Sequence, residues 1–212
     1  MSDGHDSNAG AILTRRTVLA AGVHLIAVSQ LPGAAWALSP AGEVASVRGL
    51  AEAEANGLKR ALATKAPVYE GELVMTGDDA RLALMLGARS MLRLGAQTRV
   101  RIDRYLVDAG GEFDLQSGAI EFERAKGAPK ADLNFRSAYG LIAVRGTRFF
   151  AGPSKGVFGV FVDHGRVDVV AGSKIVSVGP GLGTDIAKPG DAPTPVGKWK
   201  APRINAALAS VR

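Results

Sequence analysis

Apolar residues alternate with other residues along residues 82–122, and glycines such as Gly87 and Gly95 interrupt the alternation. A repeat of two residues places successive side chains on opposite faces of a β-strand. The pattern therefore predicts short neighbouring strands, each with one buried face. Its apolar positions are Leu82, Leu84, Leu86, Leu92, Leu94, Val100, Ile102, Phe113, Leu115, Ile120 and Phe122.

The strand pattern continues towards the C-terminus. Residues 157–162 are apolar on both faces, which predicts a central strand that is covered on each side. About a dozen short strands in one domain indicate an all-β fold, either a sandwich or a solenoid-like stack. The further strands are expected at residues 133–135, 141–144, 148–151, 157–162, 167–170 and 175–178.

Two segments at the ends of this pattern are less regular. Residues 49–62 predict a hairpin that turns at Asn56-Gly57, although residues 51–55 could equally begin a helix. The all-β domain is expected to cover residues 38–191, followed by a tail rich in proline and glycine at residues 192–212. In that tail, residues 203–212 predict a short amphipathic helix, which either packs on its own domain or docks on a partner or anionic membrane.

The first 37 residues have the order of a secretory signal. Arg15 and Arg16 precede an uncharged apolar stretch at residues 18–31, and Ala35 and Ala37 supply the small residues of a cleavage site. The apolar stretch is shorter than the roughly 20 residues that span a bilayer, so cleavage is favoured over an anchor. The paired arginines favour twin-arginine export, with an ordinary secretory signal as the alternative. The expected location is the bacterial periplasm.

Composition narrows the classes of function. The chain has no cysteine, which excludes disulfides, thiolate metal sites and a cysteine nucleophile. The net charge of +6 favours anionic partners. In a bacterial envelope these are lipopolysaccharide, anionic phospholipid and cell-wall polymers rather than nucleic acid.

Candidate chemistry is sparse. His164 is the only histidine after the signal segment, which excludes a metal centre built on histidine. The sequence around it, residues 163–166, is typical of an exposed hairpin turn rather than of a catalytic triad. Asp78 and Asp79 lack further calcium ligands, and residues 179–183 lack the lysine of a phosphate loop. We therefore expect no catalytic residues, no metal site and no cofactor.

Four arginines form the candidate binding site. If the apolar positions of residues 82–102 face inward, then Arg81, Arg93, Arg99 and Arg101 face outward on nearby strands. They are either ordinary solvated charge or a surface for an anionic ligand, because guanidinium groups bind carboxylate and phosphate through paired hydrogen bonds.

Four segments in this order resemble the FecR domain, the extracytoplasmic domain of bacterial regulators of iron-transport signalling. They are residues 71–102, 112–122, 141–152 and 157–170, and the most specific of them contains Arg145-Gly146-Thr147. A glycine there can supply a bulge between buried strands, while Arg145 and Thr147 bond neighbouring main chain, so the motif is a structural signature. The chain departs from the family's acidic turn at residues 87–90, which here carry a positive charge.

The resemblance implies a non-catalytic sensor or scaffold that binds a ligand or an envelope protein. Regulators of this family hold a sigma factor in the cytoplasm through a segment that precedes a membrane-spanning helix. Only residues 1–14 precede the paired arginines, too few for such a segment, so we expect the sensor part alone. The alternatives are a binding module for anionic polysaccharide, cell wall or lipopolysaccharide and, less favoured, a small glycan-active enzyme.

Overall fold

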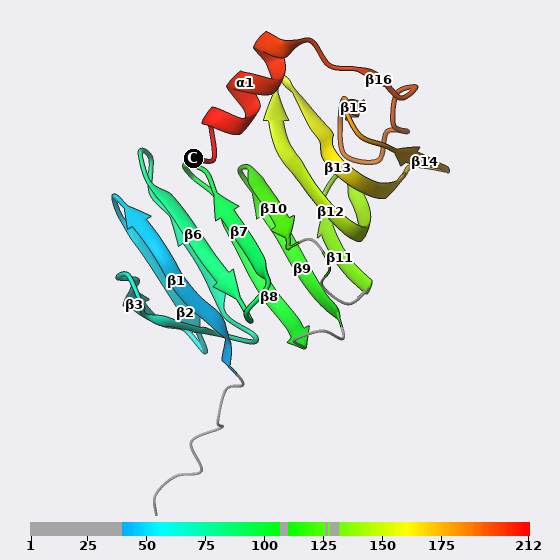
Figure 1. Ribbon diagram of the computed structural model, residues 1–212. Coiled ribbons are helices and arrows are strands. Elements are labelled where there is room, and N and C mark those ends of the chain that lie inside the picture. The colour runs from blue at the N-terminus through cyan, green and yellow to red at the C-terminus, as the bar shows by residue number, and fades with distance from the viewer. Residues whose placement is uncertain (1–39, 107–109, 126, 128–131) are drawn as a thin grey trace, which may run out of the picture. The chain divides into compact units, whose positions relative to one another are not determined.

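The computed structural model describes residues 40–106, 110–125, 127 and 132–212. The expected export signal, with Arg15, Arg16, Ala35 and Ala37, lies outside the described residues. Sixteen strands of the described part join in one sheet, and a single helix follows them near the C-terminus (Figure 1). The expectation of an all-β fold with a short C-terminal helix is confirmed. No helix within the described ranges is both long and apolar enough to cross a lipid bilayer.

The sheet consists of two halves that share the long strands β12 (Gly140–Ser154) and β13 (Val157–Ala171). We call them the first and second half-sheets. Almost all neighbouring strands are antiparallel, the exception being β9 beside β11. The first half-sheet contains β3 (Leu58–Ala61), β2 (Ala51–Ala55), β5 (Leu73–Thr76), β8 (Arg99–Leu106), β9 (Gly110–Ser117), β11 (Asp132–Ser137) and β14 (Lys174–Val178). The second contains β4 (Pro67–Tyr69), β1 (Pro40–Arg48), β6 (Arg81–Leu86), β7 (Ser90–Leu94), β10 (Ile120–Arg124), β15 (Leu182–Ile186) and β16 (Gly197–Lys198).

The two half-sheets are joined where β12 and β13 change partners. The first part of β12 pairs with β11 and its later part pairs with β10, while β13 pairs first with β15 and then with β14. A bulge separates the two parts of β12 between Arg145 and Arg148. Gly146 there has φ 59° and Gly165 on β13 has φ 82°, a region that favours glycine. The two glycines let both strands bend at the same level.

Thr147 holds this junction together. Its buried hydroxyl group donates to the carbonyl of Arg166 at 2.8 Å and accepts from the N–H of the same residue at 3.2 Å. Gly165 packs so closely that a β-carbon on it would lie 2.5 Å from the carbonyl oxygen of Gly146. The Arg145 side chain is exposed, and that residue takes part through its carbonyl oxygen, which lies 2.9 Å from the Thr147 hydroxyl. The Arg-Gly-Thr motif therefore lies where the first half-sheet passes into the second.

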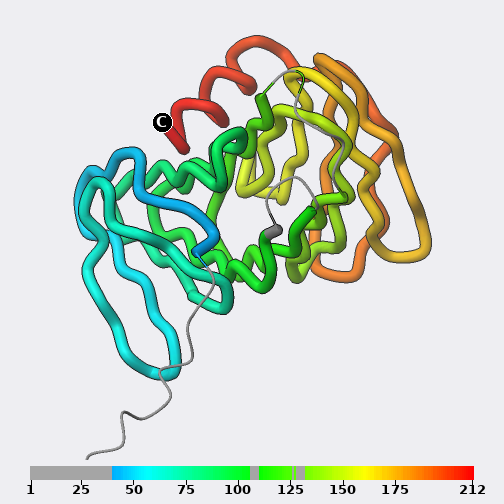
Figure 2. Tube along the Cα trace, turned by 60° about the horizontal axis from the view of Figure 1, so that its bottom comes forward, coloured from blue at the N-terminus to red at the C-terminus, as the bar shows by residue number. Residues whose placement is uncertain are grey.

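The hydrophobic core lies between the half-sheets, which face each other in Figure 2. Phe135 occupies its centre, with ring centroids 4.7 Å from Phe113 in the first half-sheet and 5.3 Å from both Phe122 and Phe149 in the second. All four rings are fully buried. The alternation of apolar positions thus supplies the inner faces of a sandwich whose halves belong to one continuous sheet.

Helix α1 (Ala201–Ala209) covers part of the outer face of the second half-sheet. Trp199, just before it, stacks on Phe161 of β13 at a centroid distance of 5.4 Å. Gly159 and Gly183 make room for the indole ring, since a β-carbon on them would lie 2.7 and 2.2 Å from it. The apolar side of the segment packs against this face through Ile204, Ala207, Leu208 and Val211.

Arg203 fixes the helix to the sheet through polar contacts. Its guanidinium group donates to both carboxylate oxygens of Asp185 at 2.9 and 2.6 Å. The same group lies 3.5 Å above the ring of Trp199, a favourable cation–π arrangement. These contacts determine where the chain end, Val211 and Arg212, meets the sheet.

Of two predicted turns and one predicted central strand, the structure contains the first turn and the strand. The hairpin at residues 49–62 is confirmed as β2 and β3, with Asn56 and Gly57 at φ 52° and 77°, so the helical alternative was wrong. The central strand at residues 157–162 is confirmed, with the core on one side and Trp199 on the other. The prediction of an exposed turn at His164 was wrong, because this half-buried residue lies inside β13, opposite Arg148. Gly165, which follows His164, bends strand β13 rather than ending it.

Candidate functional site

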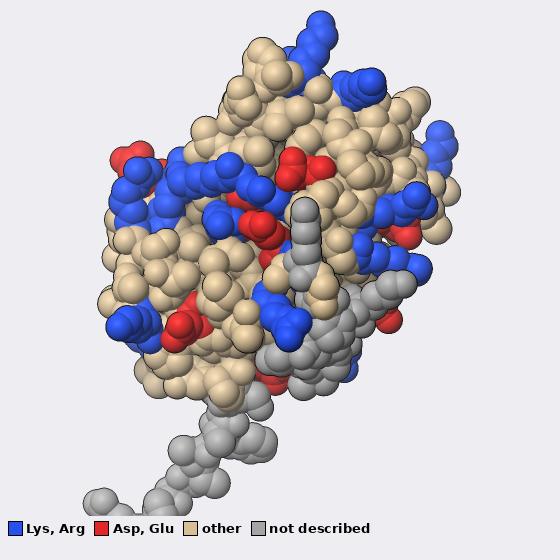
Figure 3. Space-filling model, in the orientation of Figure 1, with Lys and Arg blue, Asp and Glu red and all other residues tan. Residues whose placement is uncertain are grey.

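Charged side chains gather on the outer face of the second half-sheet. The alternation that turns leucines inward on β6 and β7 turns Arg93 outward, directly opposite Glu121 of β10 and Ala83 of β6. In Figure 3, basic side chains gather over the upper part of β6 and β7, and acidic side chains lie beside them. The register of the strands thus brings together charges that are far apart in the sequence.

Glu121 is the centre of the first charge group on this face. Its carboxylate is fully buried and accepts hydrogen bonds from Arg148 at 2.8 Å and from two nitrogens of Arg212 at 2.6 and 3.0 Å. Arg93 lies 3.5 Å from the same carboxylate and 3.3 Å from Glu123. Burial alone lowers the pKa of Arg148, but its hydrogen bond and attraction to Glu121 outweigh burial and raise that pKa above its usual value. The group is a structural cluster of ion pairs centred on Glu121.

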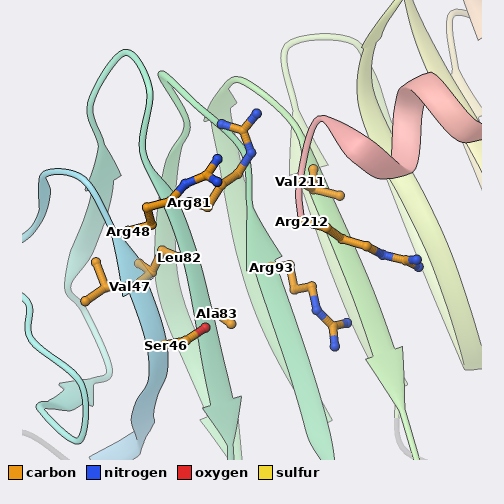
Figure 4. A pocket seen from close by; sticks show the side chains of 9 residues that line it. All are labelled: Ser46, Val47, Arg48, Arg81, Leu82, Ala83, Arg93, Val211 and Arg212. Atoms are coloured by element: carbon orange, nitrogen blue, oxygen red, sulfur yellow. The ribbon is translucent and has the colours of Figure 1, made fainter.

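Beside this cluster lies a groove of about 370 Å³ between β1, β6, β7 and the chain end (Figure 4). We call it the arginine groove. It is lined by apolar side chains, a serine and four arginines. The lining residues are Ser46, Val47, Arg48, Arg81, Leu82, Ala83, Arg93, Val211 and Arg212.

Arg48 and Arg81 differ from the other two arginines of the groove. They are direct cross-strand partners on β1 and β6. Like charges at directly opposite positions destabilise a pair of strands. Within the described part of the chain, no carboxylate lies within 4 Å of either guanidinium group. Arg81 donates from one Nη atom to its neighbour's carbonyl at 2.8 Å, while its buried Nε has no hydrogen-bond partner among the described residues. Such an unsatisfied donor costs about 1–3 kcal/mol.

The structure separates the four arginines that the sequence suggested as one face. Arg81 and Arg93 both line the arginine groove, but Arg99 and Arg101 lie on β8 in the first half-sheet. The prediction of a single basic face is therefore corrected: the four arginines form two pairs on different half-sheets. The reason is that the connection after β7, at residues 95–98, crosses from one half-sheet to the other, so β7 and β8 are not neighbours.

Sequence reasoning missed Arg48, Arg212 and Glu121. Glu121 alternates with Ile120 and Phe122, which could have marked it as outward-facing, but an outward glutamate is usually solvated and this one is fully buried. Arg48 and Arg212 join the site through strand pairing and helix docking over long sequence distances. No local pattern contains that information.

The arginines of the first half-sheet are engaged locally. Arg101 donates to the carbonyl of Gly71 at 2.9 Å, and Arg99 lies 3.0 Å from the sulfur of Met75. Asp103 and Asp114 share this face with them. Burial, and then repulsion by Asp114, raises the pKa of Asp103 above its usual value of 3.8. This face is therefore mixed in charge.

Asp103→Asn is expected to raise the melting temperature slightly at pH 7. A carboxyl group whose pKa is raised by folding destabilises the folded state once it is charged, and the amide removes that penalty. Near pH 3 the carboxyl is protonated in both states, so wild type and variant should melt alike. Thermal unfolding followed by circular dichroism at the two pH values measures this, and a stabilisation of equal size at both values would contradict it.

The described residues offer little for metal chemistry. Among them, no group of three or more histidine, cysteine or acidic side chains is arranged to hold a metal ion. The chemistry that the arginine groove can perform is recognition of an anionic group, since guanidinium groups do not act as general acids or bases near neutral pH.

Comparisons with known proteins agree with the fold. Residues 72–168 match the family model described as FecR protein. Two crystal structures of a candidate anti-sigma factor from Parabacteroides distasonis ATCC 8503 are similar, with TM-scores of 0.52 and 0.53 and sequence identities of 16% and 14%. The matches cover 64% of this chain, which spans 64% and 63% of those chains, under two thirds of their length. No curated protein sequence matches.

Proposed function

We propose that this chain, in which residues 72–168 are a FecR domain, is a signalling protein that binds a ligand or partner protein outside the cytoplasm and catalyses no reaction. The family match supports a signalling role. The similar fold of a candidate anti-sigma factor is consistent with it. The order of residues 1–37, with Arg15 and Arg16 before an apolar stretch, supports export to the periplasm as a sensor or scaffold, including in iron-transport signalling.

The observation that best supports binding is the arginine groove. It combines a hollow of small-ligand size with two arginines, Arg48 and Arg81, that no described carboxylate neutralises. Maintaining two like charges as direct cross-strand partners lowers stability. An anionic group brought by a partner or ligand would relieve that repulsion, so recognition of such a group is the function that this surface supports best.

Capture from the protein's own envelope tests this role. The exported protein, fractionated from the periplasm and carrying a photo-crosslinker at Ser46 in the groove, is expected to yield one specific envelope protein. A matched crosslinker at Gln116, on the outer face of the first half-sheet, should not yield it. Recovery of the same products from both positions, or of none from either, would contradict partner binding at the groove.

A second candidate is a binding module for anionic envelope polymers, such as polysaccharide, cell wall or lipopolysaccharide. The net charge of +6 and the two unneutralised arginines favour it. Binding to a purified polymer without any protein partner, and its loss as salt is raised, would support this alternative. Capture of a protein that persists in high salt would support the first.

A further inference from the structure

We infer that Arg48 and Arg81 form a binding site for a phosphate group, carried either by a small soluble phosphate ester or by a lipid headgroup. The inference rests on the proposed binding role of the arginine groove and names the chemical group that it takes. It concerns only the end of the groove between β1 and β6, where these two residues are direct cross-strand partners.

Charge favours phosphate over carboxylate at this pair. Two guanidinium groups present two positive charges, and a phosphate monoester carries roughly −1.5 to −2 near pH 7. A carboxylate carries a single charge, and one guanidinium fork can satisfy both of its oxygens. A phosphate monoester also has three strong acceptor oxygens, enough to pair with both arginines at once.

The donors around the pair fit such a group. Arg48 is exposed, and the buried Nε–H of Arg81 lacks an acceptor among the described residues. Figure 4 shows the two side chains close together at one end of the groove, with Ser46 farther along the same wall. Pairing this donor with bound phosphate requires the Arg81 guanidinium group to turn so that its buried Nε–H faces the groove.

The remaining groove fits the body of a phosphate ester. Val47, Ala83 and Val211 provide apolar wall, and the volume of about 370 Å³ lies in the range of small-molecule sites. Arg93 and Arg212 also line the groove, but both already pair with the buried Glu121, whereas Arg48 and Arg81 pair with no described carboxylate. The site thus consists of two available cations, a hydroxyl group and a partly apolar pocket.

Titration of the full chain with inorganic phosphate and with a phosphate ester, followed by NMR at constant ionic strength, tests the inference. Saturable binding is expected to shift the Arg48 and Arg81 side-chain signals. Arg48→Gln/Arg81→Gln should weaken binding about tenfold or more, because charge-assisted hydrogen bonds are lost. Arg99→Gln/Arg101→Gln, on the other half-sheet, removes the same charge and should bind as wild type does.

A stability measurement shows that loss of binding is not loss of folding. Without phosphate, Arg48→Gln/Arg81→Gln is expected to melt at or above the wild-type temperature, because the repulsion between direct cross-strand partners is removed. With phosphate, only wild type and the control variant should gain melting temperature. Equal gains in all three proteins would overturn the site. So would binding no stronger than that of chloride at the same ionic strength for every phosphate probe, soluble or carried on a lipid.

Vesicles distinguish the two sources of phosphate. Binding to phosphatidic acid vesicles, but neither to phosphatidylcholine vesicles nor to soluble phosphate, assigns a lipid headgroup, whereas saturable soluble binding assigns a free ester. Failure with every phosphate probe overturns this inference alone. Partner binding at the groove is tested separately, and it fails if crosslinking at Ser46 captures no specific envelope protein.

Discussion

Replacing Glu121 by alanine is expected to lower the free energy of unfolding by about 3 kcal/mol. The carboxylate is fully buried, and it accepts hydrogen bonds from Arg148 and Arg212 while attracting Arg93. Removing one partner of a buried ion pair costs about 3–5 kcal/mol because the remaining charge loses its compensation. The three arginine side chains are 24–43% exposed and can partly rehydrate, which places the effect at the lower end. Urea unfolding at pH 7 measures it.

Glu123→Ala is the matched control. Glu123 lies on the same strand and contacts Arg93 at 3.3 Å, but its side chain is 34% exposed. Exposed ion pairs contribute about 0–1 kcal/mol, so this variant should lose little stability. If both variants lost the same small amount, Glu121 would not be the centre of the charge cluster. The arginine groove would then lack the fixed wall that Arg93 and Arg212 provide.

Gly165→Ala is expected to destabilise the fold by a comparable amount, about 3 kcal/mol. The residue has φ 82°, and left-handed backbone costs an alanine about 1–2 kcal/mol. Its new β-carbon would also lie 2.5 Å from the Gly146 carbonyl oxygen and 2.8 Å from the α-carbon of Thr147. Backbone atoms cannot rotate away, so crowding adds about 1–3 kcal/mol. The lost stability is read from thermal or urea unfolding.

Gly156→Ala separates crowding from backbone strain. Gly156 has nearly the same φ, 80°, but a β-carbon there would meet nothing within 4 Å. It should therefore show only the cost of positive φ. Equal losses in the two variants would mean that the close approach of Gly165 to Gly146 does not stabilise the junction of the half-sheets.

Much of the sandwich can be read from the sequence, because its core follows a period of two. Leu82, Leu84, Leu92 and Leu94 alternate in the sequence and are fully or almost fully buried. The Asn56-Gly57 turn is equally local, since its conformation depends on two residues. Where short-range pattern determines structure, prediction from the sequence was right.

Prediction failed where the chain changes half-sheet or bends without ending a strand. His164 was expected in a turn because Gly165 follows it, yet that glycine bends the continuous strand β13. Arg99 was expected beside Arg93 because their strands are consecutive, yet the intervening connection passes from the second half-sheet to the first. Which strands become neighbours depends on packing between distant segments, and alternation alone does not report it.

The candidate site combines both kinds of information. The outward positions of Arg81 and Arg93 are predicted by the alternation. Arg48 is placed in the groove by the pairing of β1 with β6, and Arg212 by the packing of α1 on the sheet. Trp199 and Arg203 position that helix, so the last wall of the groove depends on contacts that the sequence pattern does not reveal.

The central claim is that the arginine groove is the binding surface of this protein. Its most direct test compares recovery of the captured envelope partner by three proteins: wild type, Arg48→Glu/Arg81→Glu and Arg99→Glu/Arg101→Glu. Charge reversal is the same in both variants, but only the first pair lines the groove. Partner recovery is expected to be lost in the groove variant and retained in the control. Equal recovery by all three folded proteins would contradict it.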